Sequence, residues 1–156
     1  MVLPVQELVG FRGTPDAELA FQLQDREPGV EWILPDEIQE MLDRSPGIRA
    51  DTRGLPVGVF LGAEVRRVGD PLYGELRRMG ALVDAEVALI PVRAGARTAG
   101  DTGVTIRVHA ALLDVRTGRV LWFGVEEGDE GRRDDPAVLA SAIDELARSL
   151  LWYSRR

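Results

Sequence analysis

The chain has 156 residues, of which 45% are hydrophobic and 29% are charged, as in an ordinary soluble globular protein of one domain. These proportions exclude a disordered chain, and no apolar run approaches the roughly 18 residues of a membrane-spanning helix. The net charge of −7 disfavours nucleic acid as a partner. All 19 basic side chains are arginine and cysteine is absent, which excludes lysine chemistry, disulfides and thiolate sites.

The first 45 residues predict alternating strands and helices. Residues 2–5 have the character of a strand, and Thr14-Pro15 predicts a helix to about residue 26, because proline at the first helical position loses no hydrogen bond. Apolar residues alternate over 30–34, which predicts a second, short strand. Pro35 then opens a second helix that ends near residue 45.

The middle of the chain predicts a long loop followed by a helix. Residues 48–69 are rich in Gly, Pro and Arg and show no sustained period, so we expect a flexible surface loop with one short element at most. Asp70-Pro71 then predicts the start of a third helix. Its apolar residues recur at i, i+4, i+7 and i+11, which gives the helix one buried stripe: Leu72, Leu76, Met79 and Val83.

The last third of the chain predicts a strand, a hairpin and a closing helix. Residues 86–92 are apolar on both faces, as in a central strand covered by helices. Residues 94–103 contain small residues and glycine, and we expect a flexible connection there. Asp135-Pro136 predicts the start of a C-terminal helix, whose inward face carries Leu139, Ile143, Leu146 and Leu150.

Residues 103–127 form the clearest element, two long strands joined by a tight turn. Apolar and polar residues alternate over 104–109, the pattern of a half-buried strand. Gly118 ends the turn because glycine reaches positive φ without steric cost, and Asp114 can accept hydrogen bonds from the turn backbone. In the second strand Trp122 and Phe123 point to opposite faces, so one is expected in the core and the other partly exposed.

Together these elements predict an α/β fold in one domain over residues 1–156. We expect a single mixed sheet of about five strands that includes the C-terminal β-hairpin, with helices packed on it and a closing C-terminal helix.

The order of these elements and the hairpin residues resemble a superfamily of bacterial envelope lipoproteins. The opening strand, residues 30–35 with the helix that follows, and residues 85–90 are similar to the corresponding elements, and residues 108–122 resemble the family hairpin of a long strand, Leu-x-Asp, x-x-Thr-Gly and x-Val-x-Trp. Curli-secretion lipoproteins, lipoprotein activators of penicillin-binding proteins and the amino-terminal domain of TolB share this fold. The resemblance implies a non-enzymatic, exported assembly or regulatory module, periplasmic or associated with the outer membrane.

Family members are often anchored through a lipidated cysteine, which this chain lacks, and the curli channel's membrane-spanning insertion is also absent. Because the sequence begins directly in a strand-like segment, we expect either a cytosolic protein or one whose leader was removed.

The residues suggest no reaction centre. His109 is the only histidine, and catalysis would require a carboxylate or nucleophile beside it, so we expect a solvated or partner-facing side chain. The acidic run from Glu126 to Asp135 does not fit an EF-hand, because Gly131 and Arg132 occupy positions that need an oxygen ligand and a glycine. We therefore predict no catalytic residues, no metal and no cofactor.

Two sets of residues are candidates for binding. An interaction surface for a protein partner is expected around the outward side chains of the hairpin: Arg107, His109, Trp122 and Phe123. Paired arginines near and on the third helix are candidates for an anionic ligand: Arg66, Arg67, Arg77 and Arg78.

Three functions follow as hypotheses. The first is a non-catalytic protein-interaction or assembly module of the cell envelope, the soluble part of a lipoprotein. The second is a small-molecule-binding or anion-binding protein or an enzyme, whose site would combine the acidic run with the arginine pairs. The third is a structural homo-oligomer that associates through sheet edges or the terminal helix.

Overall fold

A four-stranded mixed sheet with helices on both sides forms the molecule. The computed structural model describes residues 1–154, and the strand order is β1-β2-β3-β4, with β1 parallel to β2 and the other pairs antiparallel. The elements are β1 Glu7–Val9, α1 Pro15–Arg26, α2 Pro35–Asp43, α3 Val59–Gly62, α4 Leu72–Val83, β2 Val87–Ala99, β3 Gly103–Asp114, β4 Val120–Glu127 and α5 Pro136–Ser154. Within residues 1–154 no helix combines the length and the apolar character needed to cross a membrane.

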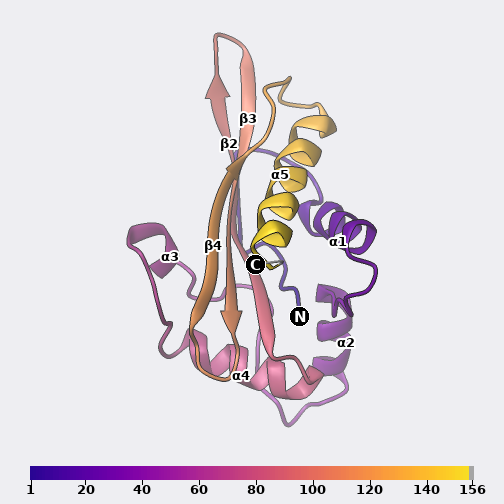
Figure 1. Ribbon diagram of the computed structural model, residues 1–156, viewed down its shortest axis with the longest axis vertical. Helices are drawn as coiled ribbons and strands as arrows, with labels where there is room; N and C mark the ends of the chain where they lie inside the picture. Colours follow the sequence, from indigo (N-terminus) through magenta and orange to yellow (C-terminus); the bar gives the residue numbers. More distant parts are fainter. Residues whose placement is uncertain (155–156) are drawn as a thin grey trace.

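Two hydrophobic cores lie on the two faces of the sheet. In the first, α1 and α5 pack on β2 and β3 through residues such as Leu89, Val108 and Ile143. The second gathers around α4, which runs across the lower end of the sheet in Figure 1, and includes Ile90 and Leu113. Adjacent residues of one strand therefore contact different cores, because strand side chains alternate between faces.

The helix predictions are confirmed for the four longer helices. α1 spans the predicted range, and α2 and α5 begin at the predicted prolines. The Asp135 carboxylate accepts a hydrogen bond from the amide of Ala137 at 2.9 Å, as expected of a residue that caps a helix start. All four predicted inward leucine and isoleucine residues of α5 are buried.

The hairpin between β3 and β4 is also confirmed. Gly118 has φ of +70°, and Asp114 accepts a hydrogen bond from the amide of Thr117 at 2.7 Å. This bond holds the pKa of the Asp114 carboxyl below its usual value. Asp114 and Gly118 thus stabilise the conformation of the turn backbone, as their sequence predicts.

The sheet has four strands where about five were expected, because the two strands predicted at 2–5 and 30–34 are wrong and β1 was not predicted. Residues 30–34 form an irregular segment, although the Ile33 carbonyl accepts a hydrogen bond from the amide of Val2. At the N-terminus Val2 makes a single parallel bridge to Leu89, whereas the strand that joins the sheet is β1, a few residues later. β1 has only three residues, Glu7, Leu8 and Val9, which are too few to show the alternation by which the sequence could predict a strand.

The two predicted connections also differ from expectation. The flexible connection over 94–103 is wrong over 94–99, which belong to β2 and pair with β3 through Ala99 and Gly103. Residues 48–69 do contain one short element, α3, but they also bury Leu55, Val57, Phe60 and Val68 in the second core. The apolar side chains of this segment therefore belong to the second core, so the segment is not a flexible surface loop.

Candidate interaction surface

Among the helices of residues 1–154, none lies over one half of one sheet face, and we call this half the open face. The strand register aligns its residues in rows: Glu7, Arg93, His109 and Val125 in the first row and Val9, Gly95, Arg107 and Glu127 in the second. Arg97 lies opposite Thr105 beyond them, and Phe123 borders the covered half. In Figure 1 the face lies on the upper left flank of the sheet, above α3.

The charges of the open face are arranged in cross-strand pairs. Glu7 of β1 pairs with Arg93 of β2, and Arg107 of β3 pairs with Glu127 of β4 at 2.6 Å. The Thr105 hydroxyl also donates a hydrogen bond to the other oxygen of the Glu127 carboxylate, at 2.6 Å. This hydroxyl and the Arg107 guanidinium together hold the pKa of the Glu127 carboxyl below its usual value.

His109 lies in the middle of the open face and is half-buried. Burial lowers the pKa of its imidazole, and the Arg107 and Arg93 guanidinium groups lower it further, so the ring is neutral at pH 7. Its Nδ1 has no hydrogen-bond partner among residues 1–154. The structure therefore places His109 among cations, where it is not charged and not poised beside a carboxylate.

Exposed apolar side chains accompany these charges. Phe123 is 40% exposed, Val125 44% and Val9 47%. The Phe123 ring stacks on Phe60 of α3, with centroids 6.0 Å apart and an angle of 11° between the ring planes. Phe123 thus marks the border where α3 stops covering the sheet.

Trp122 does not join the other three interaction candidates. It lies on the opposite face of β4, half-buried against the core of α1 and α5. This agrees with the expectation that the two adjacent aromatic residues divide between core and surface. The structure brings together Arg107, His109 and Phe123, and adds Glu7 and Val9, which sequence reasoning missed because β1 has no strand pattern.

The arginines of α4 lie at the lower end of the molecule, beside a shallow pocket of about 480 Å³. The guanidinium carbon of Arg77 lies 5.9 Å from the centroid of the Tyr73 ring, close enough for a cation–π interaction. Arg78 is paired with Glu75.

Arg66 and Arg67 lie near this end too, beside the hairpin turn. Arg67 forms an antiparallel backbone bridge with Arg119, and Arg66 lies 3.8 Å from Glu64 in a highly exposed pair. The acidic run of residues 126–135 follows β4 at the other end of the long axis (Figure 1). The structure therefore does not bring the acidic run and the arginine pairs together.

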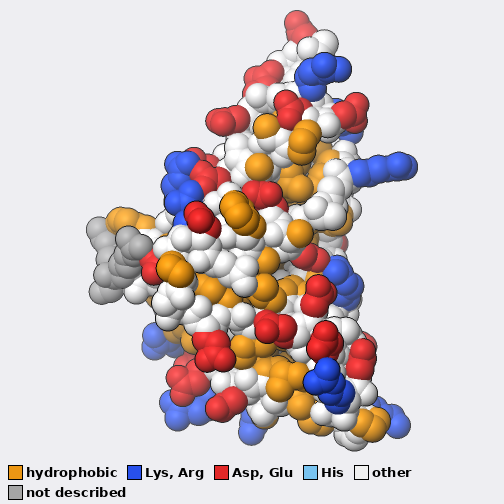
Figure 2. Space-filling model, turned by 90° about the vertical axis from the view of Figure 1, so that its right-hand side faces the viewer, with side chains coloured by type: hydrophobic (Ala, Val, Ile, Leu, Met, Phe, Trp, Pro, Cys, Tyr) orange, Lys and Arg blue, Asp and Glu red, His pale blue; other side chains and the backbone are white. Residues whose placement is uncertain are grey.

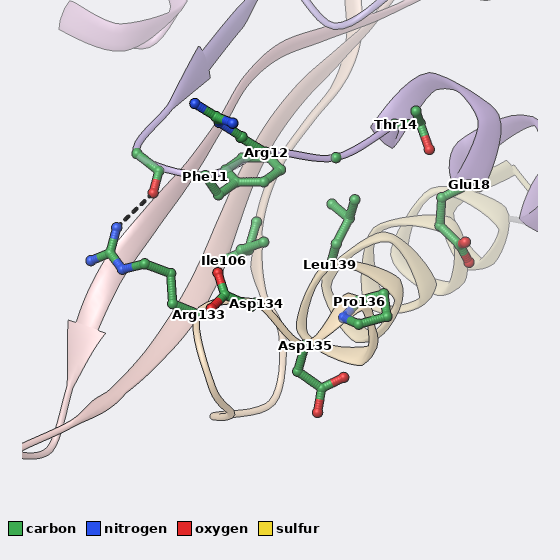
Figure 3. A pocket seen from close by; sticks show the side chains of 12 residues that line it. Phe11, Arg12, Thr14, Glu18, Ile106, Arg133, Asp134, Asp135, Pro136 and Leu139 are labelled. Carbon is green, nitrogen blue, oxygen red and sulfur yellow. Dashed lines mark hydrogen bonds between the residues drawn. The ribbon is translucent and has the colours of Figure 1, made fainter.

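A pocket of about 680 Å³ opens between the first turns of α1 and α5 (Figure 3). Glu18 of α1 and Thr14 just before that helix line it on one side, and Pro136 of α5 and Asp135 just before that helix line it on the other. Arg133 spans one side and donates a hydrogen bond to the Gly10 carbonyl at 2.8 Å. Because its arginines and carboxylates are close to balanced in number, this pocket favours no particular charge. Within residues 1–154 no three His, Asp or Glu side chains gather closely enough to hold a metal ion.

The helical side of the molecule presents a different surface. Figure 2 shows acidic, basic and apolar side chains interspersed there in small groups. Asp144 of α5 pairs with both Arg26 of α1 and Arg148, so these helices are also joined by ion pairs. On this side α1 and α5 cover the hydrophobic core, whereas on the open face the strands themselves form the surface.

No protein-family model and no curated protein sequence matches this chain. Among solved structures, lipoprotein GNA1162 from Neisseria meningitidis is similar with a TM-score of 0.54 and 15% identity, over 96% of this chain and 95% of that protein. The LpoB C-terminal domain from Salmonella enterica has a TM-score of 0.44 and 15% identity, over 84% and 79%. The hypothetical protein CT253 from Chlamydia trachomatis has a TM-score of 0.49 and 12% identity, over 98% and 92%. The match to GNA1162 confirms the lipoprotein-like fold expected from the hairpin.

Proposed function

We propose that this chain is a protein-binding module of the bacterial cell envelope and that it holds its partner on the open face. The proposal includes no catalytic step. The observation that carries it is the uncovered half of a sheet face whose other half is closed by α3, α4 and residues 48–69.

The composition of the open face supports a protein partner. Valine and phenylalanine side chains, each more than a third exposed, lie beside two cross-strand ion pairs. Apolar contacts with a rim of charges are the usual anatomy of a protein interface. Docking a partner would also exclude water from Arg93 and Arg107, which strengthens charge complementarity with acidic groups on that partner.

The envelope location is proposed from the fold. The similarity to lipoprotein GNA1162 spans nearly the whole of both chains, and the sequence pattern of the hairpin resembles envelope lipoproteins. We infer a periplasmic or outer-membrane-associated module, the soluble part of a lipoprotein.

Site-specific photocrosslinking in the native host tests this function. A photoreactive phenylalanine analogue replaces Phe123 in one strain and Phe21 in another. Phe21 is a matched control, because it is the same residue type, lies on α1 and is 62% exposed. We expect a discrete adduct with an envelope protein from position 123 that is absent from position 21.

A charge reversal adds specificity to that experiment. Arg107→Glu should abolish the adduct at position 123, whereas Arg148→Glu on α5 should leave it intact. Adducts with cytosolic proteins alone would refute the envelope assignment. Adducts equally strong at both positions would refute the open face as the binding surface, and an adduct of twice the mass of this chain would favour a homo-oligomer.

A further inference from the structure

The outer edge of β4 carries backbone groups that no strand of residues 1–154 pairs with. β4 is last in the strand order, and Figure 1 shows it along the left side of the sheet. The Gly128 amide donates a hydrogen bond to the Ile106 carbonyl at 3.1 Å, so the hydrogen-bonded pairs with β3 continue through Glu126 and every second residue before it. The N–H and C=O groups of Val125 and Glu127 therefore point away from β3, toward the free edge.

The chain itself pairs a short segment with the lower end of this edge. Residues 66–68 run antiparallel to residues 118–120, and the Val120 amide donates a hydrogen bond to the Arg66 carbonyl at 2.9 Å. α3 lies beside the middle of β4 in Figure 1, and within residues 1–154 no strand continues the pairing along Val125 and Glu127. The edge thus accepts an antiparallel segment at one end and is open in its C-terminal half.

The open half of the edge is also regular. Proline and β-bulges are two devices by which natural proteins interrupt an edge strand. Residues 123–127 contain no proline, and the register of β4 with β3 shifts only near Leu112, below this stretch. Phe123 and Val125 expose apolar side chains on the open face here. An added strand would therefore find both hydrogen-bonding groups and apolar contacts.

We propose that the partner adds an extended segment to the edge of β4, antiparallel to β4 and hydrogen-bonded to Val125 and Glu127. The proposal rests on the function proposed above and deepens it, because the side chains of these two residues lie on the open face. In an antiparallel pair, residues that exchange hydrogen bonds lie directly opposite and place their side chains on the same face. The segment should therefore alternate, with apolar residues that both bond to β4 and lie beside Phe123 and Val125.

A segment of another protein fits this edge better than a second copy of the chain does. Each copy carries a net charge of −7, so two copies repel each other. A second copy would also bring its own α3 to the edge, whereas an extended segment brings one strand only. Strand addition by an extended segment takes its affinity from main-chain hydrogen bonds and its specificity from alternate side chains.

An NMR titration of the full chain with a capped, uncharged peptide, Thr-Val-Thr-Val-Thr, tests the proposal. Two matched peptides carry N-methyl groups on the two valines or on the last two threonines. We expect the unmethylated peptide to shift the amide signals of Val125 and Glu127. Methylation of the valines should weaken binding at least about fivefold, because it removes the N–H groups that face β4. Methylation of the threonines, whose N–H groups face away from β4, should change the affinity less than about twofold.

A proline variant tests the same hydrogen bonds from the side of the protein. Val125→Pro removes an N–H that β3 does not use, so the sheet should tolerate it, as thermal melting can verify. It should weaken binding of the unmethylated peptide at least about tenfold, whereas Val125→Thr, which keeps the N–H, should weaken it about two- to threefold. Val30→Thr serves as the control, because this valine is 46% exposed outside the open face, and it should bind as the unsubstituted chain does. The methylated peptides decide the test without any variant if the proline variant does not fold.

Three results would overturn the added strand. One is equal affinity of the two methylated peptides, and another is full affinity in Val125→Pro. The third is a dimer in analytical ultracentrifugation that dissociates on Val125→Pro, which would assign the edge to a second copy.

Failure of the added strand differs from failure of the proposed function. If Val125→Pro keeps the adduct at position 123 that Arg107→Glu abolishes, the partner docks on the open face without adding a strand, so the function stands and the added strand is refuted. If the unsubstituted chain gives no adduct at position 123, the proposed function is refuted, whatever the peptides do.

Discussion

The two halves of one sheet face differ in what lies over them, although the same strands build both. In the covered half β2 and β3 contribute Ile90, Val92 and Leu113, all fully buried beneath the helical layer. In the open half they contribute Arg93 and Arg107. The change occurs at a register shift in β2 between Pro91 and Arg93. The pattern of apolar and polar residues in a strand therefore indicates whether other elements pack over it, as well as its extended conformation.

The largest expected effect is a core truncation in the covered half. Leu113→Ala should lower the free energy of unfolding by about 2–5 kcal/mol, because it removes a buried side chain and leaves a cavity. Val125→Ala in the open half should cost less than about 1 kcal/mol. Urea unfolding of both variants measures the difference. Equal losses would mean that the open half is covered in solution.

The border between the halves should give the next largest effect. Phe60 and Phe123 stack across it, so a double-mutant cycle with Phe60→Leu and Phe123→Leu should give a coupling of about 0.5–1.5 kcal/mol. The measurement is urea unfolding of the parent, both single variants and the double variant. A coupling near zero would indicate that the contact between Phe60 and Phe123 does not stabilise the packing of α3 on the sheet.

The cross-strand ion pair of the open half should contribute less. The coupling between Arg107→Met and Glu127→Gln should be about 0.2–1 kcal/mol, and it should shrink in high salt because both side chains are partly exposed. Thr105→Val, which removes the hydroxyl that hydrogen-bonds Glu127, should raise the pKa of that carboxyl in an NMR titration. An unchanged pKa would contradict the hydrogen bond.

The smallest effect should be the pH dependence due to His109. An unfolded histidine binds a proton near pH 6.5, whereas folded His109 does so only at lower pH. Stability present above pH 6.5 is therefore lost as the pH falls toward the folded pKa, since the unfolded state takes up the proton first. His109→Gln should flatten this dependence. An NMR midpoint at or above 6.5 would contradict the burial and the neighbouring arginines that lower the pKa of His109.

Elements with strong local signals were predictable from the sequence. Proline at the first turn marked α1, α2 and α5, and the buried stripe of α4 followed from its period. The hairpin was predictable because Asp114 and Gly118 make their own turn, whatever packs around them. Such signals are local, so a single sequence is enough to show them.

Elements that depend on distant partners were not predictable. Glu7–Val9 is a strand because β2 is beside it, and its own residues are all exposed. Residues 94–99 read as a linker because they are alanine, glycine, arginine and threonine with no sustained apolar pattern, although β3 pairs with them throughout. The open face combines both cases, so its hairpin residues were predicted and its β1 residues were missed.

The paired ends of β2 and β3 project beyond the helices at the top of Figure 1. β1 pairs with β2 as far as Gly95 and β4 pairs with β3 as far as Arg107, so beyond those residues the described sheet narrows to a two-stranded arm, bridged to Gly131 at Val104. A two-stranded ribbon is marginally stable by itself. Amide protons near the arm's tip should therefore exchange with solvent by local opening, well before global unfolding. The open face begins at the base of the arm, so a docked partner would slow this exchange. Part of the binding free energy would then offset the conformational entropy that the arm loses when it becomes ordered.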